Sequence, residues 1–388
     1  MSYWNIFNYI DWILFIPVFL TIVYLGIFAL ASLIVRHSET PVTKHENRFI
    51  VLIPSYKAGK SLEMTVKSIL GQSYPQRLFD VTVIADHENE MTLFHLAQHP
   101  ITLLTPNFDK SSRTKSLQLA INNLPQFKIY DTVLILESGD VVESEFLEQV
   151  NDAYESAGTK AIQTHKLSLN RDTTSARLSA IFEEINNSIF RRGHITVGLS
   201  SALSSSGMVF DFNWFKQHIL ATNSVWEDRV LEAQLLRERV YVDYFDKILV
   251  YSEKARQAED FNRQHRGYLL TQLRTILRNI RHMPIALINR QYDLLDKLIQ
   301  WLLIPRMLLM VIIAIMSVIT PFISFGAVFK WWGLFASILL IFALATPDYL
   351  VDDKWDSTFF KLPVVMSSSL LEKFALGRKI KAFINLKK

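Results

Sequence analysis

The apolar residues of the chain follow two patterns, long uncharged runs toward the ends and short runs in the middle. The long runs cover residues 13–35, 307–329 and 331–347, and the first two contain 23 residues each. At about 1.5 Å per residue, such a run crosses a hydrocarbon core of about 30 Å. The third run has 17 residues and is separated from the second by Lys330 alone. The pattern predicts one transmembrane anchor and a later transmembrane hairpin.

The middle of the chain alternates short apolar runs with helix-like segments. The apolar runs are RFIVLI (48–53), DVTVIAD (80–86), ITLLT (101–105) and DTVLILE (131–137), and KAIQTHK (160–166) is a plausible further strand. Helix-like segments follow each of the first three runs, and another begins near Glu143. This alternation is typical of βαβ units and predicts an α/β domain with a Rossmann-like, mostly parallel mixed sheet and helices on both faces. Ligands of such sheets bind beyond the carboxyl ends of the strands.

The basic residues beside the long apolar runs predict the orientation. No Lys or Arg precedes the first run, whereas Arg36, Lys44 and Arg48 follow it. The last stretch, from Lys373, carries six basic residues and no acid. By the positive-inside rule, the middle region and the C-terminus lie in the cytoplasm and the N-terminus lies outside. We therefore expect an integral membrane protein of a bacterial inner membrane.

Composition narrows the class of function. The net charge is +4 and the chain contains no cysteine, which fits a cytoplasmic domain without disulfides. The cations beside the apolar runs explain the charge, and no basic patch interleaved with aromatic residues occurs in the middle, so nucleic acid is not expected as a partner. The sequence also lacks a Gly-rich phosphate loop of the dinucleotide or Walker type.

These patterns divide the chain into five parts. Residues 1–47 are expected to form a transmembrane anchor and linker, and 48–265 the cytoplasmic α/β domain. Residues 266–305 read as amphipathic interface helices, 306–347 as the transmembrane hairpin, and 348–388 as a basic amphipathic cytoplasmic tail.

Seven motifs of the middle region resemble the family 2 glycosyltransferases in their order and rough spacing. They are VLIPSYKAGKSLEMTVKSILGQSYP, VTVIADHE, RTKSLQLAI, LILESGDVVESEFL, SSALSSSGMVF, WEDRVLEAQL and QHRGY. In particular they look like the membrane-embedded synthase branch, which includes hyaluronan, chitin and cellulose synthases. The resemblance implies a GT-A fold, a nucleotide-activated sugar that is usually UDP-linked, Mg²⁺ or Mn²⁺ as cofactor, and inversion at the sugar carbon.

The resemblance assigns a donor-binding role to residues of three motifs. The matching positions are Pro54, Tyr56, Asp86, Lys115 and Gln118. Ala58 stands in the first loop where the family commonly has an acid, and Gln118 replaces an Asn. Without the resemblance, Asp86 could instead cap the next helix and Lys115 could be a solvated helix lysine.

The stretch VLILESGDVV, residues 133–142, corresponds to the family's metal-binding motif but departs from it. The family usually has two acids separated by one residue, and here Glu137 takes the place of the first and Gly139 that of the second. Asp140 is the expected substitute, because Gly139 permits a positive φ that could turn the next carboxylate inward. We expect Glu137 and Asp140 to hold the cation. The alternatives are a cation held by Glu137 alone, or a surface turn.

The motif SVWEDRV, residues 224–230, supplies the expected catalytic base. In the family the acid at the position of Asp228 takes the proton from the acceptor hydroxyl. Ser224 and Glu227 form a capping-box pattern that explains Glu227 by helix geometry alone, but it does not explain Asp228.

The resemblance also assigns acceptor-side residues, some of them through partial matches. They are Ser206, Gly207, Glu227, Gln264, Arg266 and Tyr268. In QHRGY, Gly267 replaces the family's Arg and Tyr268 replaces its Trp, while Arg266 lies one position early.

The resulting expectation is a membrane glycosyltransferase that uses a nucleotide sugar and a saccharide or lipid-linked acceptor, in polysaccharide synthesis. Membrane lipids are further expected partners, and export would need a synthase or export partner or a homo-oligomer. Two alternatives stay open. One is a polyprenyl-phosphate glycosyltransferase that adds one sugar, and the other is a degenerate, non-catalytic subunit of a synthase complex.

Overall fold

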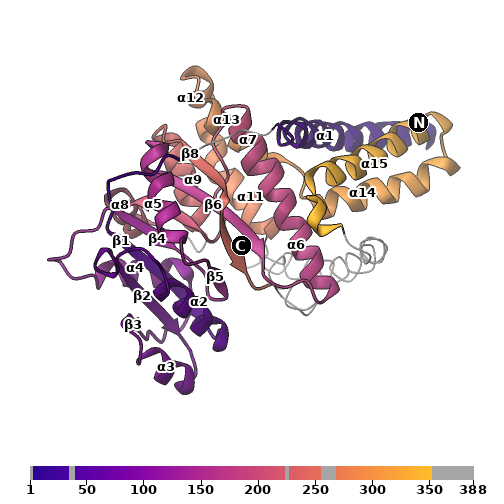
Figure 1. Ribbon diagram of the computed structural model, residues 1–388. Helices are drawn as coiled ribbons and strands as arrows, with labels where there is room; N and C mark the ends of the chain where they lie inside the picture. Colours follow the sequence, from indigo (N-terminus) through magenta and orange to yellow (C-terminus); the bar gives the residue numbers. More distant parts are fainter. Residues whose placement is uncertain (1–2, 35–39, 223–226, 255–267, 352–388) are drawn as a thin grey trace, which may run out of the picture.

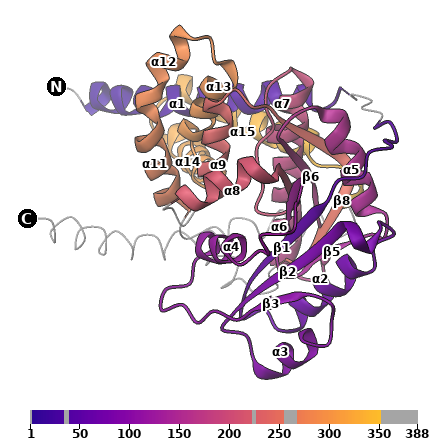
Figure 2. The same ribbon diagram turned by 90° about the vertical axis from the view of Figure 1, so that its left-hand side faces the viewer.

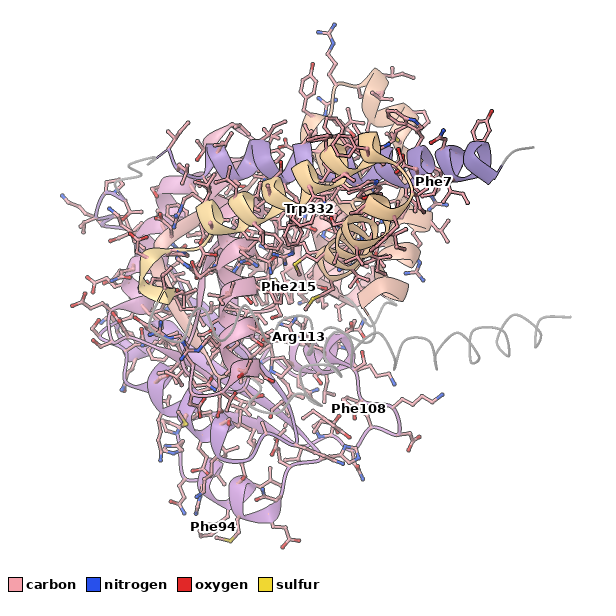
Figure 3. The ribbon with its side chains drawn as sticks, turned by 90° about the vertical axis from the view of Figure 1, so that its right-hand side faces the viewer. Phe7, Phe94, Phe108, Arg113, Phe215 and Trp332 are labelled. Carbon is pink, nitrogen blue, oxygen red and sulfur yellow. The ribbon has the colours of Figure 1, made fainter. Side chains whose placement is uncertain are left out.

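The computed structural model of the protein describes residues 3–34, 40–222, 227–254 and 268–351 (Figure 1). One eight-stranded sheet is flanked by helices, and a layer of long apolar helices lies at one end of the molecule. Figures 1 and 2 both place α3 (Glu90–Leu96) at the end opposite α1 (Tyr3–Ala31). In Figure 3, Phe94 marks the first end, and Phe7 and Trp332 mark the apolar layer.

The sheet is mixed, with its parallel part formed first along the chain. Its order is β3-β2-β1-β4-β7-β6-β8-β5. The strands are β1 (Phe49–Tyr56), β2 (Phe79–Asp86), β3 (Thr102–Leu104), β4 (Thr132–Ile135), β5 (Asp140–Val142), β6 (Ala161–Ser168), β7 (Met208–Asp211) and β8 (Val242–Ser252). The pairs among β1 to β4 and the β6–β8 pair are parallel, whereas β7 and β5 pair antiparallel with their neighbours.

Helices cover both faces of the sheet, which confirms the predicted α/β fold. They are α2 (Lys60–Leu70), α4 (Arg113–Asn122), α5 (Phe146–Ala157), α8 (Phe212–Ala221) and α9 (Glu227–Arg237). Val51 and Ile53 of β1 pack in one apolar core with α2, α3 and α5, and Ile50 and Leu52 pack in another with α4, α8 and α9. Successive side chains of a strand point to opposite faces, so a continuous apolar run such as β1 fills both cores.

Helix caps explain where several of these helices begin. Asn89 accepts a hydrogen bond from Thr92 N–H at 2.8 Å and starts α3. Asp211 accepts one from Trp214 N–H at 2.7 Å and starts α8. Such side chains satisfy N–H groups that have no partner within the helix.

A helical segment after β6 joins the sheet to the apolar layer. It consists of α6 (Thr174–Asn186), the π-helical η2 (Asn187–Arg192) and α7 (Gly193–Thr196). A Cβ on Gly193 would lie 2.3 Å from the carbonyl oxygen of Phe28 in α1, so only glycine allows this approach. His194 stacks on the Phe28 ring at 3.8 Å, and Tyr24 donates to Asp296 Oδ1 at 2.8 Å. The apolar layer is therefore fastened to the rest of the chain by close contacts.

Two helices of the layer are long and apolar enough to span a membrane, the stretch Phe7–Ala31 of α1 and the whole of α15 (Phe325–Ala345). A third candidate is a pair of helices bent by 50°, α13 (Tyr292–Leu302) with α14 (Arg306–Ile319) and its 3₁₀ extension η4 (Thr320–Phe322). The interruption of the apolar runs at Lys330 predicted the hairpin turn at that residue, and this position is wrong. The turn lies at 320–324, where Pro321 lacks the N–H that would continue α14.

Lys330, expected in that turn, instead lies inside α15. It forms a salt bridge with Asp11 of α1, and Trp331 Nε1 donates to the other Asp11 oxygen at 2.6 Å. A paired lysine is tolerated in an apolar helix far better than an unpaired one.

The remaining described helices connect these regions. They are α11 (Tyr268–Asn279), α12 (Met283–Ile288), and the 3₁₀ turns η1 (Gln76–Leu78), η3 (Ile280–His282) and η5 (Asp348–Leu350). Leu294, Leu298 and Trp301 of α13 form a small core with Leu236 of α9 and Ala286 of α12. Figure 2 shows α11, α12 and α13 beside one another, with α1 passing behind them. The predicted tail lies outside the described residues beyond position 351.

Candidate functional site

The carboxyl ends of β1 and β2 bring the first predicted donor-binding residues together. Pro54 and Tyr56 of β1 pair in register with Ile84 and Asp86 of β2. Asp86 is buried, its Oδ1 lies 2.6 Å from His87 Nδ1, and it accepts a 3.5 Å hydrogen bond from Phe108 N–H. The Tyr56 ring meets the His87 ring edge-on. This edge therefore combines one acid with aromatic faces.

The helix-capping alternative for Asp86 is wrong, because Asn89 caps α3. A different acid, Glu88, organises the loop that follows β1. Its carboxylate accepts hydrogen bonds from Ser55 Oγ at 2.6 Å and from the Ala58 and Gly59 N–H groups at 2.7 and 2.9 Å. Glu88 thus brings a carboxylate to the loop in which Ala58 supplies none.

Lys115 and Gln118 lie on α4 but make different contacts. Lys115 Nζ donates to Lys110 O at 3.0 Å and lies 5.7 Å from the centroid of the Phe108 ring. It therefore shares Phe108 with Asp86. Gln118 Nε2 donates to Ile219 O and Thr222 O at 2.9 and 2.8 Å, at the end of α8. Its amide nitrogen is thus occupied in joining two helices.

Asp140 lies in the interior of the site. It is 1% exposed and accepts hydrogen bonds from the hydroxyls of Ser206 and Ser252 and from Glu137 N–H, the last at 2.7 Å. Gly139 has a φ of 93°, and this turn does direct the Asp140 carboxylate inward. Burial raises the pKa of Asp140 and the nearby Lys166 lowers it, and burial is the larger effect. Asp140 holds β5, β8 and the loop before β7 together.

Glu137 is bound to a buried lysine. Lys166 Nζ lies 2.8 Å from Glu137 Oε2 and donates to Ser205 Oγ at 3.0 Å, and Ser205 Oγ donates to the same Glu137 oxygen at 2.9 Å. Burial alone would raise the pKa of Glu137, but the charges of Lys166 and Arg113 lower it to about 2. Glu137 raises the pKa of Lys166 in turn. Both groups are therefore charged at neutral pH.

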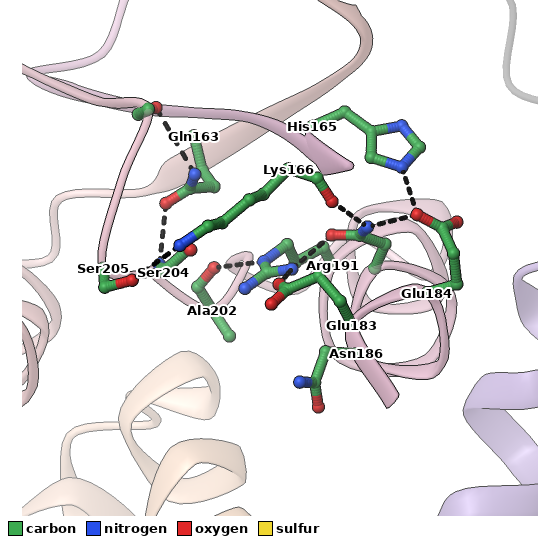
Figure 4. A network of polar contacts seen from close by, with 12 residues as sticks. Gln163, His165, Lys166, Glu183, Glu184, Asn186, Arg191, Ala202, Ser204 and Ser205 are labelled. Carbon is green, nitrogen blue, oxygen red and sulfur yellow. Dashed lines mark hydrogen bonds and ion pairs between the residues drawn. The ribbon is translucent and has the colours of Figure 1, made fainter. Parts of the chain in front are cut away.

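The serine-rich loop before β7 depends on Gly207. Its N–H donates to Ile135 O at 2.9 Å, its φ is 68°, and a Cβ there would lie 2.0 Å from Thr164 Oγ1. Gln163 fixes the loop, since its Nε2 donates to Ser206 O and its Oε1 accepts from Ser204 N–H, as Figure 4 shows in part. A glycine is required here for the backbone to pass β6.

A second charged cluster continues from Lys166 toward α6 (Figure 4). Glu183 accepts hydrogen bonds from Arg191 Nη1 at 3.2 Å and Lys254 Nζ at 3.3 Å. These cations, with Lys166, lower the pKa of Glu183 despite its burial. Arg191 also donates to Ala202 O at the start of the serine-rich loop. The loop is therefore held from both sides.

A cavity of about 410 Å³ lies between α6, α9 and the start of α14. Its wall includes Asp228, in the first turn of α9, together with Ser204, Ser205 and Glu183. Burial raises the pKa of Asp228, although the charges of Arg113 and Arg229 act against the shift. A carboxylate with a raised pKa is a stronger proton acceptor than an exposed one.

Four of the predicted acceptor-side residues cannot be placed by their side chains. Gln264 and Arg266 lie outside the described residues. Glu227 and Tyr268 begin α9 and α11, and only their backbone is described. Their roles remain predictions.

The sequence analysis missed several residues that build the site. Glu88, Arg113 and Lys166 all stand within stretches singled out above. Glu88 follows the end of β2 and Arg113 begins α4, where a charged side chain was a usable signal, whereas Lys166 lies inside β6. Glu183 and Lys254 lie outside the motifs. Glu183 pairs with Arg191 in the same helical segment, and only the fold brings Lys254 to Glu183.

Comparison with known proteins gives a family match over the domain that carries this site. Residues 46–266, more than half of the chain, match the family described as "Glycosyltransferase like family 2". No curated protein matches the chain by sequence.

Solved structures show similarity in fold. A mannosyltransferase from Pyrobaculum calidifontis, PcManGT, in complex with GDP-mannose and Mn²⁺, is 12% identical, with a TM-score of 0.53 over 92% of this chain and 98% of that one. Residues 1–349 of S. aureus TarS match with 12% identity and a TM-score of 0.43 over 86% and 91% of the two chains. The same TarS fragment with UDP-GlcNAc matches with 13% identity and a TM-score of 0.44 over 86% and 92%.

Proposed function

The chain belongs to glycosyltransferase-like family 2, and we propose that it is an inverting membrane glycosyltransferase. It transfers a sugar from a nucleotide donor, UDP-linked, to a saccharide or lipid-linked acceptor. The position of Ser205 carries the proposal. Its hydroxyl bonds to Glu137, and it also lines the cavity that Asp228 faces. The expected leaving-group site and the expected base thus share one wall.

The donor nucleotide binds at the carboxyl ends of β1 and β2. Asp86 and Tyr56 contact the base and ribose, and the Glu88-organised loop after Pro54 closes beside them. Lys115 contributes positive charge at the same edge, where it lies over Phe108. Gln118 acts from α4 by holding the end of α8. The support for this arrangement is that Tyr56, Asp86 and Phe108 meet at one edge of the sheet.

The residues around Glu137 leave one side of its carboxylate open to a divalent cation. Lys166 and Ser205 both bond Oε2, and the side chain is 34% exposed, so a cation can approach its exposed side. The Asp140 carboxylate is hydrogen-bonded to hydroxyl groups and to the Glu137 backbone. This favours Glu137 as the only protein carboxylate that would bind the cation. Across the described ranges no three His, Asp or Glu side chains form a metal site, so the donor diphosphate would supply further ligands. When bound, Mg²⁺ or Mn²⁺ neutralises charge on the leaving diphosphate.

Asp228 acts on the acceptor. Its carboxylate accepts the proton of the acceptor hydroxyl as that oxygen attacks the anomeric carbon, and the nucleoside diphosphate leaves with the bonding electron pair. Ser206 and Gly207 shape the backbone beside this point, because Gly207 brings the loop against β6. Glu227, Gln264, Arg266 and Tyr268 complete the acceptor side in this proposal.

The protein sits in a membrane through α1, α15 and the α13–α14 pair. The support is their length and composition, together with exposed apolar side chains such as Ile13, Leu20, Phe329 and Leu340. The cations beside the apolar runs support a cytoplasmic position for the sheet domain.

The test is nucleotide release by the purified protein in lipid nanodiscs, with a panel of UDP and GDP sugars and Mg²⁺ or Mn²⁺. We expect release of nucleoside diphosphate with at least one donor, and loss of release in EDTA. Glu137→Gln should need a higher cation concentration, whereas the exposed variant Glu148→Gln on α5 should behave as wild type. No release with any donor would instead favour the non-catalytic subunit.

A further inference from the structure

The carboxyl end of β8 brings a largely buried lysine, Lys254, to the edge of the sheet where the proposed donor binds. β8 runs parallel to β6, and β7 pairs antiparallel with both β6 and β4, so β4, β6 and β8 end at the same edge. Lys254 follows Ser252, the last residue of β8, by two positions. Because Ser252 pairs with Asp140 of β5, Lys254 lies beside the turn at residues 137–139.

Lys254 contacts an acid that it shares with another cation. Its side chain is 10% exposed, and its Nζ donates to Glu183 Oε2 at 3.3 Å. Arg191 Nη1 lies 3.2 Å from the other oxygen of the same carboxylate. Hydrogen bonds between an ammonium group and a carboxylate usually measure about 2.7 to 2.9 Å, so the contact made by Lys254 is a long one. One carboxylate thus serves two cations that have lost most of their water.

The other acids near this point are bound to different groups. Glu137 lies 2.8 Å from Lys166 Nζ, and both oxygens of Asp140 accept hydrogen bonds from serine hydroxyls. Glu253, which precedes Lys254 in the chain, accepts a hydrogen bond from a serine hydroxyl of α2 at 2.7 Å. These contacts leave Glu183 as the acid that Lys254 contacts within the described ranges of the chain.

Lys254 keeps the capacity to bind an anion in the cavity that it lines. An ammonium group carries three N–H donors, and the bond to Glu183 uses one of them. Burial lowers the pKa of Lys254, whereas the charge of Glu183 raises it, and burial is the larger effect. An anion in the cavity would compensate for the water that the ammonium group has lost.

The position of Lys254 relative to the two proposed chemical groups identifies this anion. Ser205 lies in the cavity wall and bonds to Glu137, the residue proposed to meet the cation and the diphosphate. The wall also contains Asp228, the proposed base, which faces the acceptor. The anomeric carbon and its bond to the diphosphate must lie between these two groups. The leaving oxygen of the diphosphate is therefore the anion that the cavity presents to Lys254.

We propose that Lys254 is a catalytic residue that binds the donor diphosphate and stabilises the charge that develops on it as the sugar is transferred. The inference rests on the proposed function and adds a residue to it. The acceptor oxygen attacks the anomeric carbon, and the bond from that carbon to the phosphate oxygen breaks. The electron pair stays on the phosphate oxygen, to which Lys254 Nζ donates a hydrogen bond while it keeps its proton. A cation fixed at a developing negative charge lowers the barrier to transfer.

The test compares ligands with and without the diphosphate. Isothermal titration of the full chain in lipid nanodiscs measures the affinities for UDP and uridine, with GDP and guanosine as a second pair. Lys254→Gln keeps an N–H donor toward Glu183 but removes the charge. We expect it to weaken diphosphate binding about tenfold to a hundredfold, because a hydrogen bond between charged groups is lost, and to leave nucleoside binding within about twofold. The rate of nucleotide release at saturating donor should fall about tenfold or more.

Two further variants control for an effect on the fold. Lys254→Met should show the same selective loss of diphosphate binding. Lys247→Gln removes a charge from an exposed position of β8 and should bind UDP and release nucleotide as wild type does.

The outcomes separate the inference from the proposed function. Unchanged UDP affinity in Lys254→Gln, or equal losses of UDP and uridine affinity, overturns the inference and leaves the proposed function intact when the wild-type protein releases nucleotide. A loss in Lys247→Gln as large as that in Lys254→Gln also overturns it. A wild-type protein that binds none of the four ligands and releases no nucleotide contradicts the proposed function, and the inference falls with it.

Discussion

The two ends of the sheet each carry a lysine–carboxylate pair with the same 2.8 Å separation, and the pairs differ in what surrounds them. At the amino ends of the strands, Lys128 meets Asp80 with side chains 42% and 36% exposed. At the carboxyl ends, Lys166 meets Glu137 with side chains 7% and 34% exposed. The distance between the charged atoms alone therefore does not tell how much a pair contributes to the stability of the fold.

The difference follows from how much water each pair has lost. An exposed pair gains little, because water and salt screen the attraction and two long side chains lose freedom. The pair at the carboxyl ends is joined by Ser205 and lies close to Arg113 and Asp140, so its charges interact with several groups at once. Removing one member there leaves the others without compensation. The carboxyl ends of the strands, where we propose the chemistry occurs, should accordingly tolerate less change than the amino ends.

The largest expected effect is at the proposed base, Asp228. Asp228→Asn keeps the shape of the side chain but cannot accept a proton, so turnover should fall by about 10² to 10⁴. Isothermal titration should show donor binding within a few-fold of wild type. Turnover near the wild-type rate would place the base elsewhere.

Lys166→Met should produce the largest loss of stability among the changes at the two pairs. It leaves the Glu137 carboxylate partly buried without its cation, and we expect a loss of about 3 kcal/mol, the lower end of the range for buried pairs, because Glu137 keeps some exposure. Urea unfolding in detergent measures it. The double variant Lys166→Met with Glu137→Gln should recover most of the loss, and a double variant as unstable as the single one would show that packing, not charge, is responsible.

Lowering the pH should reduce the contribution of Glu137 to the stability of the fold over a defined pH range. The folded-state pKa of Glu137 is lowered from 4.5 to about 2, so its stabilisation is present above the unfolded-state pKa and is lost as the pH falls through the folded-state value. The raised pKa of Asp140 acts with the opposite sign. The informative quantity is therefore the difference in melting temperature between wild type and Glu137→Gln, which should shrink between about pH 5 and pH 2. A difference that is constant with pH would contradict the charged state of Glu137.

The smallest effect is expected at the exposed pair. Lys128→Met should change the free energy of unfolding by about 0 to 1 kcal/mol and leave turnover unchanged. The same urea series provides the measurement. A loss as large as that of Lys166→Met would remove the contrast between the two ends of the sheet.

The sequence predicted the parallel part of the sheet because buried parallel strands read as continuous apolar runs. The strands β1, β2, β3 and β4 overlap such runs, and β6 overlaps the further strand expected at 160–166. It missed β5 and β7, which have three and four residues, and β8, in which buried and half-buried positions alternate. The pairing of these strands is determined by the neighbouring strands. A short run has too few residues for its own hydrophobic pattern to identify it as a strand.

The sequence located the acids at the strand ends, such as Asp86 and Glu137, whose roles stay predictions. The partners of those residues could not be located in this way. Asp140 receives hydroxyl groups from positions 66 and 112 residues later in the chain, and Lys166 reaches Glu137 across 29 residues. Such contacts depend on the order of strands in the sheet, which local patterns do not encode.

The contact between α1 and α7 has a consequence for how the protein is made. Tyr24 bonds to Asp296, 272 residues further along the chain, and Phe28 packs on His194 and against Gly193. At a synthesis rate of about 5 to 20 residues per second, the ribosome needs roughly 14 to 54 seconds to add the residues between Tyr24 and Asp296. Throughout that interval the tyrosine hydroxyl of the first helix lacks its native acceptor. Biogenesis of this enzyme therefore includes a waiting period in which lipid, water or an insertion factor must occupy the surface that α7 and α13 later cover.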